Sequence, residues 1–149
     1  METQPSNAQN TGDPLMEMEI YKEFTFEAAH RLPNVPEGHK CANLHGHSYV
    51  VKITVDAPVD PKTGWVQDFS DLGDAFAPFR AQLDHQYLND VPGLLNPTCE
   101  VLAEWLFWKL KEKLQWLSEV EVKETKSSGC IFRDRGKEGL NFVMSHPFG

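Results

Sequence analysis

The amino-acid sequence predicts an α+β domain built on an antiparallel sheet. Three segments, residues 20–30, 44–57 and 119–125, alternate apolar and polar side chains with a period of two, which is typical of strands. Helical spacing and capping residues mark two later segments, near residues 70–83 and 96–117. The strands follow one another through turns, in the order β-β-β-α-α-β-β. This order favours an antiparallel sheet over parallel β-α-β units.

The first two predicted strands carry histidines on their apolar faces. In the strand over residues 20–30, His30 falls on the more apolar face, with Phe24 and Phe26. A loop containing prolines and glycine follows, and the strand over residues 44–57 places His45 and His47 on the same face as its apolar residues. We therefore expect all three imidazoles on the buried side of the sheet.

The middle of the sequence predicts a hairpin and two helices. After the turn DPKTG at 60–64, the stretch WVQDF at 65–69 is predicted as a short third strand. Ser70 and Asp71 are typical of a helix start, and this first helix should run to about Leu83, disturbed at Pro78. Asn96 and Pro97 fit the start of a longer helix. Its apolar stripe consists of Leu102, Trp105, Leu106, Leu110, Leu114 and Leu117.

The length of 149 residues suits a single domain. Residues 1–18 are polar and aperiodic, so we expect a flexible leader, followed by the domain over 19–135. The segment CIFR at 130–133 is a candidate final strand, and residues 136–149 form a C-terminal tail of uncertain order. Three cysteines without an export signal indicate reduced thiols rather than a disulfide framework.

Charge and hydropathy exclude two classes of partner. The formal net charge is −8, which is unfavourable for nucleic-acid binding. No apolar run approaches the roughly 20 residues that a membrane helix needs, so no membrane partner is expected. The first residues lack the pattern of a signal peptide, and we expect a cytoplasmic protein.

The stretch HKCANLHGHSYV at 39–50 points to a metal site. Two histidines at i and i+2 on a strand point the same way and lie roughly 6 to 7 Å apart along the chain. With His30 on the neighbouring strand, His45 and His47 form the three-imidazole set typical of catalytic zinc. The alternative is that these are ordinary core or surface histidines. The motifs HExxH, PCxxC and CxxC are absent, so other common zinc sites fit less well.

Three acidic or basic side chains remain ambiguous from the pattern alone. Glu124 continues the face of Val120 and Val122, so it is either a strand-end residue reaching solvent, or a buried acceptor for a polar ligand or a group in proton relay. Asp84 and His85 are adjacent in sequence, and adjacent residues rarely face each other, so the dipeptide alone is weak evidence for a site. From the pattern it is interpreted as a polar helix terminus, with His85 complementing the helix dipole.

Six motifs occur in order along the chain: FTFEAAHRLP, C-x3-HGH, TGWVQDF, LDHQYLND, NPTCE and VKET-x4-CIFR. Taken together, they resemble the 6-pyruvoyltetrahydropterin synthase family. The resemblance covers roughly residues 21–133 and is closest to the bacterial branch that makes 6-carboxy-5,6,7,8-tetrahydropterin for queuosine biosynthesis. This resemblance implies a tunnel fold, an antiparallel four-stranded sheet with two helices on one face. It also implies trimers that close into an oligomeric barrel, a homohexamer made of two trimers, and sites at subunit interfaces.

The resemblance also implies roles for particular residues. The zinc ligands would be His30, His45 and His47, and Cys41 would be the catalytic thiol that accepts a proton rather than a fourth ligand. Asp84 and His85 would assist Cys41, while Glu124 would anchor the pterin ring and join the relay. Thr98 and Glu100 fall in a segment near the pterin pocket. His39 matches no ligand and is expected on the surface, and Cys99 and Cys130 are interpreted as structural.

The implied substrate is a small pterin triphosphate, 7,8-dihydroneopterin triphosphate. The products would be 6-carboxytetrahydropterin, acetaldehyde and triphosphate, and Lys40, Lys126 and Arg133 are candidates for binding the triphosphate by position. The sister activity, 6-pyruvoyltetrahydropterin synthase, is the alternative, although the short Cys41-x3-His45 spacing favours the carboxy branch. A non-catalytic zinc- or pterin-binding module and an unrelated three-histidine zinc enzyme are weaker alternatives.

Overall fold

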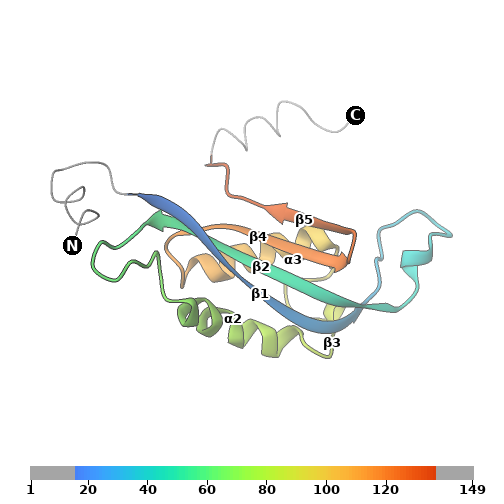
Figure 1. Cartoon of the computed structure of the whole chain (residues 1–149). Coiled ribbons are helices and arrows are strands. Elements are labelled where there is room, and N and C mark those ends of the chain that lie inside the picture. The colour runs from blue at the N-terminus through green and yellow to red at the C-terminus, as the bar shows by residue number, and fades with distance from the viewer. Residues whose placement is uncertain (1–15, 137–149) are drawn as a thin grey trace.

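A computed structural model describes residues 16–136, which form one sheet with two helices packed against it. The sheet has five strands in the order β3-β1-β2-β4-β5 (Figure 1). The long strands are β1 (Glu17–His30) and β2 (His45–Pro58), followed by β4 (Leu117–Thr125) and β5 (Ser128–Phe132), while β3 (Gln86–Tyr87) is short. The helices are α2 (Phe69–Leu83) and α3 (Cys99–Lys111), and two 3₁₀-turns are η1 (Lys40–Ala42) and η2 (Leu88–Asp90).

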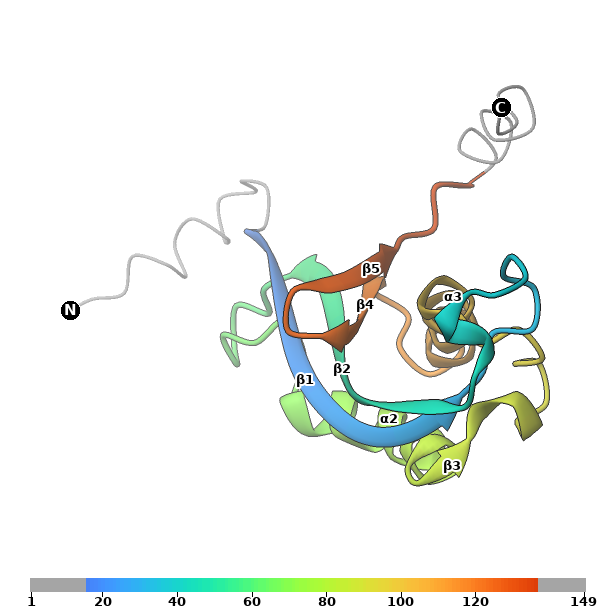
Figure 2. The same cartoon turned by 90° about the vertical axis from the view of Figure 1, so that its right-hand side faces the viewer.

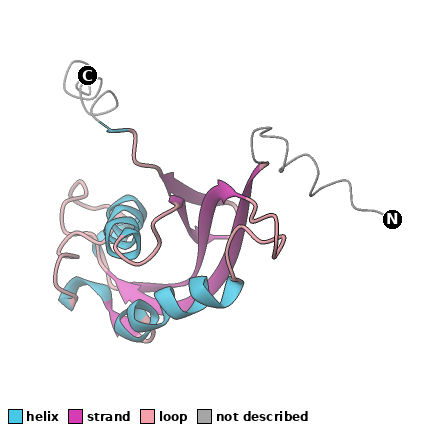
Figure 3. Ribbon diagram, turned by 90° about the vertical axis from the view of Figure 1, so that its left-hand side faces the viewer, coloured by secondary structure: helices cyan, strands magenta, loops and turns pink. Residues whose placement is uncertain are grey.

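The predicted α+β class and its two helices are confirmed. The four long strands pair antiparallel, β1 with β2, β2 with β4 and β4 with β5. The expected count of four strands is wrong, because a fifth strand, β3, pairs parallel with β1 through Ala28 and Ala29. It lies between the two predicted helices, in a stretch where the sequence predicted no element. Figure 2 shows β1 and β2 as long, bent ribbons, and Figure 3 shows the helices together with these strands.

Within residues 16–136, alternation along the strands creates one hydrophobic core. Phe26 of β1 and Tyr49 of β2 stack with ring centroids 4.8 Å apart, and Phe24 stacks on Phe76 of α2 at 4.5 Å. Burying each such large side chain contributes roughly 1.5–3 kcal/mol relative to leaving it exposed. The helices supply the opposite wall of the core through Leu72, Phe76, Leu102, Leu106, Phe107 and Leu110. The core therefore lies on one face of the sheet, between the strands and both helices.

The predicted strand at 65–69 is wrong. Both edges of β2 are already paired, with β1 and with β4, so the segment after the turn has no free edge to join. It forms a compact loop instead, in which the Asp60 backbone pairs with the carbonyl of Trp65. The Asp68 carboxylate accepts a hydrogen bond from the Ser70 N–H, and α2 therefore begins at Phe69, earlier than the predicted cap at Ser70.

The boundaries of the second helix also differ from the prediction. Thr98, rather than Asn96, caps α3, because its hydroxyl accepts the N–H of Val101 at 3.1 Å. The helix ends at Lys111, and the last residues of the predicted stripe lie elsewhere: Leu114 is buried in the following turn and Leu117 begins β4.

Strand β1 begins at Glu17, two residues before the expected start of the domain at residue 19. Residues 1–15 of the expected leader and residues 137–149 of the expected tail lie outside the described residues. Within residues 16–136, no helix has both the length and the apolar character needed to cross a membrane.

Two glycines give a matched test of the fold. A Cβ added at Gly129 in β5 would lie 2.5 Å from the Val122 carbonyl oxygen, whereas one at Gly73 in α2 would meet only the end of the Lys22 side chain at 3.3 Å. We expect Gly129→Ala to lower the free energy of unfolding by about 1–3 kcal/mol. Gly73→Ala should raise it by about 0.5–1 kcal/mol, because alanine favours helix. Urea unfolding measures both, and equal effects of the two substitutions would contradict the packing described for β5.

Candidate metal centre and active site

Three histidines meet where β1 ends and β2 begins. The antiparallel register pairs His30 with His45 and Ala28 with His47, which brings the three imidazoles to one corner of the sheet. The ring centroids are 4.6 Å apart for His30 and His45, and 5.0 Å apart for each of the other two pairs. One nitrogen from each ring falls in a group whose members all lie within 4.8 Å of one another. The structure therefore gathers the histidines that alternation placed on one face.

Backbone carbonyls fix the tautomers of two of these rings. His30 Nδ1 lies 2.8 Å from the Pro97 oxygen, and His45 Nδ1 lies 2.7 Å from the Asn43 oxygen. Because a carbonyl only accepts, each Nδ1 carries the proton and each Nε2 presents a lone pair. Metal-binding histidines in proteins are commonly held in this way.

The free nitrogens are spaced as metal ligands would be. The Nε2 atoms of His30 and His45 are 3.0 Å apart, so two lone pairs face each other at short range. A cation between them relieves this repulsion. Three nitrogens bound tetrahedrally at 2.0–2.1 Å from zinc would be about 3.3 Å from one another. The donor set and its spacing therefore fit one divalent metal ion.

Burial favours the neutral imidazoles of His30 and His47, the form that binds metal. Desolvation lowers the pKa of His30 and of His47, and the negative charge of Glu124 opposes this shift in both. The hydrogen bond to Pro97 also raises the pKa of His30, but burial dominates, since this side chain is only 1% exposed. Protons therefore compete weakly for these two nitrogens near neutral pH.

Tyr49 packs against the histidine cluster, a contact that the sequence pattern did not predict. It is fully buried, its hydroxyl lies 3.2 Å from His30 Nδ1, and its ring centroid is 5.4 Å from that of His47. Burial raises the pKa of the phenol, so it stays protonated. Its place two residues after His47 on the same strand face was the available sequence signal.

Glu124 reaches the histidine cluster from β4. Pairing of Val51 with Val122 carries β4 alongside β2, and the Glu124 carboxylate lies 4.0 Å from His47 Nε2. This distance is too long for a hydrogen bond but short enough for electrostatic attraction. With the residues that the structure describes, the carboxylate makes no hydrogen bond. Both carboxylate oxygens of Glu124 are therefore available as hydrogen-bond acceptors within the described part of the chain.

Cys41 lies on η1, in the loop between β1 and β2, and several hydrogen bonds hold this loop. The Cys41 carbonyl accepts from Leu32 N–H at 2.9 Å, and the Ala42 carbonyl accepts from Arg31 Nε at 3.2 Å. His39 Nδ1 accepts the Cys41 N–H at 3.0 Å, which gives this exposed histidine a structural role. The half-buried Cys41 thiol does not belong to the metal-ligand group.

Asn89 hydrogen-bonds to the backbone of Arg31, which lies between the histidine cluster and the loop that carries Cys41. From η2, its side-chain oxygen accepts the Arg31 N–H at 3.0 Å and its amide donates to the Arg31 carbonyl at 2.9 Å. Both backbone groups of Arg31 are thereby fixed, immediately after His30. The sequence analysis did not single out Asn89, because its partner lies 58 residues away.

Asp84 and His85 do contact each other, through an unusual backbone. Asp84 Oδ1 lies 3.0 Å from His85 Nδ1 and accepts the Glu27 N–H at 2.9 Å, and this backbone hydrogen bond is the main cause that lowers the Asp84 pKa. His85 has a φ of 61°, a conformation that non-glycine residues rarely adopt. Its N–H donates to the Glu27 carbonyl, and its side chain is 76% exposed.

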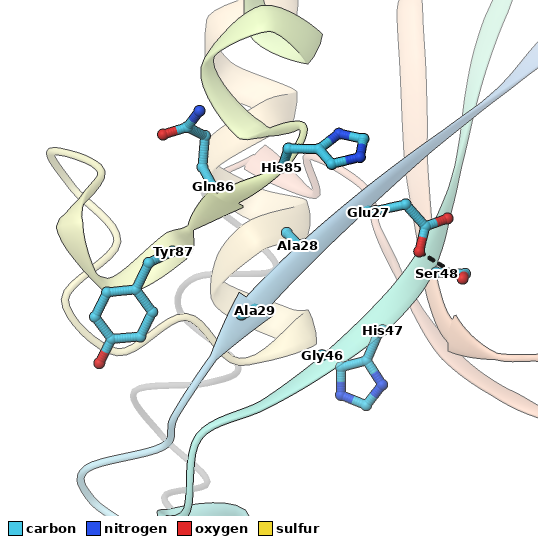
Figure 4. Close-up of a pocket in the computed structure, with 9 residues that line it drawn as sticks. All are labelled: Glu27, Ala28, Ala29, Gly46, His47, Ser48, His85, Gln86 and Tyr87. Atoms are coloured by element: carbon cyan, nitrogen blue, oxygen red, sulfur yellow. Dashed lines mark hydrogen bonds between the residues drawn. The ribbon is translucent and has the colours of Figure 1, made fainter.

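Strand β1 separates this pair from the histidine cluster. Figure 4 shows His85 on the β3 side of β1 and His47 on the β2 side. Both residues line a cavity of about 530 Å³ that crosses the strand over the small residues Ala28, Ala29 and Gly46. Within the described residues, neither Asp84 nor His85 forms a hydrogen bond or ion pair with the cluster. One chain therefore assembles the three histidines and Glu124, but does not place His85 against them.

The remaining predicted binding residues are scattered. Thr98 is used as the α3 cap, next to Pro97, and Glu100 is exposed in the first turn of that helix. Of the proposed triphosphate cations, Arg133 is engaged in a 2.8 Å ion pair with Glu119. Lys40 lies in η1 beside Cys41, and Lys126 lies in the turn between β4 and β5.

A three-histidine centre on a sheet corner, with a carboxylate beside it and a thiol on the adjoining loop, is the arrangement of a candidate metalloenzyme. The chain belongs to the 6-pyruvoyl tetrahydropterin synthase family, whose model matches residues 19–135, and it is an enzyme of that family, a lyase.

Named relatives fall in both branches of this family. The 6-carboxy-5,6,7,8-tetrahydropterin synthase of Synechocystis sp. is 48% identical over 119 residues, covering 76% of this chain and 91% of that protein. The 6-pyruvoyl tetrahydrobiopterin synthase of Drosophila melanogaster is 35% identical, covering 85% and 84%. The solved structure of Caenorhabditis elegans 6-pyruvoyl tetrahydropterin synthase matches with a TM-score of 0.74 at 26% identity, covering 80% and 97%.

The lowered pKa values of His30 and His47 predict how the metal-free protein responds to pH. The unfolded chain, where histidine has a pKa of about 6.5, binds protons more readily than the folded one. Stability should therefore be full above that pKa and fall as the pH drops below it. Urea unfolding of chelator-treated protein at several pH values measures this slope.

The variant for this measurement is His47→Gln, compared with the wild type. It removes a partly buried histidine of the cluster whose pKa is lowered by desolvation, and it should flatten the slope. An unchanged slope in His47→Gln would show that this imidazole is not held neutral by burial.

Proposed function

We propose that this chain is a zinc-dependent lyase that converts 7,8-dihydroneopterin triphosphate into 6-carboxy-5,6,7,8-tetrahydropterin, acetaldehyde and triphosphate. It would act in the cytoplasm, in queuosine biosynthesis. The observation that carries the proposal is the histidine cluster with its free Nε2 atoms 3.0 Å apart and the Glu124 carboxylate 4.0 Å from His47. The 48% identity to the Synechocystis carboxy-branch enzyme favours this product over others.

The metal ligands in this proposal are His30, His45 and His47. Zinc, when bound, would act as a Lewis acid that lowers the pKa of the vicinal hydroxyls on the substrate side chain. The Pro97 and Asn43 carbonyls hold two of the rings in the tautomer that exposes Nε2. A histidine triad leaves a further position open to substrate, which a structural four-ligand site would not.

Glu124 would bind the pterin ring. The amide and amino edge of a pterin carries hydrogen-bond donors, and a carboxylate accepts two of them side by side. Because Glu124 lies beside His47, a ring held there would direct its side chain toward the metal ligands. Thr98 and Glu100, at the start of α3 next to Pro97, would complete this part of the pocket.

Cys41 would act as the base on the substrate side chain. A thiol is an effective base when it is partly ionised, and a neighbouring cation promotes this. The hydrogen bonds of the Cys41 loop would fix where the sulfur is presented. Lys40, the preceding residue, and Lys126 are the exposed cations that we assign to the triphosphate.

Asp84 and His85 would relay the proton that Cys41 accepts. Asp84 lies 3.0 Å from His85 Nδ1, which orients the ring and leaves Nε2 as its working nitrogen. Since β1 separates His85 from the cluster of its own chain, we propose that His85 serves Cys41 of a neighbouring copy. Its 76% exposed side chain is available for such a contact.

The proposed assembly is a homohexamer, a dimer of trimers whose sheets close into a barrel. Sheet edges support this, because β3 covers β1 only at Ala28 and Ala29, and β5 forms the other edge. Unpaired strand edges favour addition of another strand. Closing the barrel would satisfy both edges and bring together groups from different copies.

The second candidate function is 6-pyruvoyltetrahydropterin synthase, which releases triphosphate from the same substrate. The Drosophila relative at 35% identity and the C. elegans structure carry that name, and both support the alternative. The Cys41-x3-His45 spacing favours the carboxy branch. Product identity separates the two functions.

Turnover of the pterin substrate tests the proposed reaction. We expect zinc-loaded protein to form 6-carboxytetrahydropterin and acetaldehyde, detected by mass, and a chelator to abolish both. Cys41→Ala should lower kcat at least about 100-fold with the metal content unchanged. Cys130→Ala removes a thiol outside the site and is the matched control. A pyruvoyl product would favour the second function, and no product from zinc-loaded protein would contradict both.

Mixed oligomers test the shared active site. Cys41→Ala and His85→Ala protein should each be inactive alone. If sites form between copies, unfolding and refolding the two variants together in equal amounts should restore about a quarter of wild-type activity per site by random assembly. Refolded wild-type protein is the control for recovery. Failure of the mixture to regain activity, when the control does, would place Cys41 and His85 in the same chain's site.

A further inference from the structure

The thiols of Cys99 and Cys130 form a hydrogen-bonded pair away from the metal cluster. The Cys130 sulfur lies 3.3 Å from the Cys99 sulfur, and the Cys99 thiol also donates to the Val122 carbonyl at 3.0 Å. Cys99 is the first residue of α3, and Cys130 lies on β5 opposite Val122. The pair is absent from the proposed mechanism, and the sequence gives no hint of it because 31 positions separate the two residues.

The two sulfurs are close enough to bond after a small movement. A disulfide requires about 2.05 Å between sulfurs, so the present separation must shorten by about 1.3 Å. Among the described strands β5 pairs only with β4, and its Phe132 also packs on Phe107 of α3. As an edge strand it can shift more readily than a central strand. Pairing with buried Val122 places Cys130 on the helix-covered side of the sheet, where Cys99 lies.

Their surroundings give the two thiols different chemical roles. Cys130 is half-buried, whereas Cys99 is only 9% exposed. Cys99 has one S–H proton, so it can donate to a Cys130 thiolate only by leaving the Val122 carbonyl. That hydrogen bond lowers the Cys130 pKa despite burial and nearby carboxylates. The hydrogen bond with Cys130 and burial both raise the Cys99 pKa. Cys130 is therefore the attacking sulfur and Cys99 the second, resolving one.

We propose that Cys130 and Cys99 form a reversible intramolecular disulfide by exchange with a low-molecular-weight disulfide. The Cys130 thiolate attacks one sulfur of the small disulfide, which breaks its S–S bond and releases one thiol. The Cys99 thiol then loses its proton and attacks Cys130, which releases the second small thiol. The small disulfide is reduced to two thiols as the two cysteines are oxidised.

The disulfide would join the start of α3 to the edge strand of the sheet. The residues just before Cys99 are Thr98, the α3 cap, and Pro97, whose carbonyl orients His30. Oxidation would tie this segment to β5 while removing the hydrogen bond that Cys99 donates to Val122. Formation of this disulfide requires only the Cys99 and Cys130 thiols and is independent of the proposed pterin reaction.

Oxidised glutathione is a suitable probe for the full-length protein. The protein is incubated with the probe, free thiols are blocked by alkylation, and peptides are identified by mass without reduction. We expect wild-type protein to yield a Cys99–Cys130 disulfide peptide while Cys41 is alkylated or glutathionylated separately. Cys99→Ala should stop at a glutathione adduct on Cys130, and Cys130→Ala should leave Cys99 unmodified. The oxidised protein should melt at least about 5 °C higher than the reduced one.

Two results would overturn the proposal. One is that Cys130 of the wild-type protein stays a free thiol, and is therefore alkylated, at a concentration of oxidised glutathione that modifies Cys41. The other is a bridge from Cys41 to either remaining cysteine. Should a single variant fail to fold, the wild-type peptide map and the melting shift, reversed by dithiothreitol, still decide the question.

Discussion

The antiparallel register of β1 and β2 is the constraint on which the candidate site depends. Because side chains alternate along a strand, pairing His30 with His45 places three imidazoles together on the buried face. A slip of one residue would turn His45 and His47 to the opposite face. The stacked rings of Phe26 and Tyr49, directly behind the cluster, disfavour such a slip, since it would expose Tyr49. The hydrophobic core therefore sets the geometry of a polar site.

The rest of the site is attached to this pair of strands by polar contacts of long sequence range. Pro97 orients His30 from the start of α3, and Asn89 holds both backbone groups of Arg31. Arg31 in turn donates a hydrogen bond from Nε to the Ala42 carbonyl, in the loop that carries Cys41. None of these supporting contacts involves the histidine Nε2 atoms, the Cys41 thiol or the Glu124 carboxylate. The local structure is held by backbone carbonyls and by the Asn89 amide instead.

Periodicity predicted the parts of the structure that alternation alone determines. The buried face of His30, His45 and His47, and the position of Glu124, follow from strand parity and agree with the structure. The prediction of a hairpin strand at 65–69 was wrong, because strand pairing depends on which sheet edges are free, and this is a property of the tertiary structure. Asn89 could not be found from its neighbours in sequence, nor could the Cys99 and Cys130 pair. The resemblance to the family supplied Cys41, whose thiol carries no periodic signal.

The central claim is that His30, His45 and His47 hold one divalent metal ion. Metal content of purified, zinc-supplemented protein, measured by inductively coupled plasma mass spectrometry, tests it most directly. His39→Ala changes a histidine of the same segment that lies outside the ligand group, and it serves as the matched control for His45→Ala. The account predicts one zinc ion per chain in wild type and His39→Ala, and loss of most zinc in His45→Ala. Full zinc occupancy in His45→Ala would contradict it.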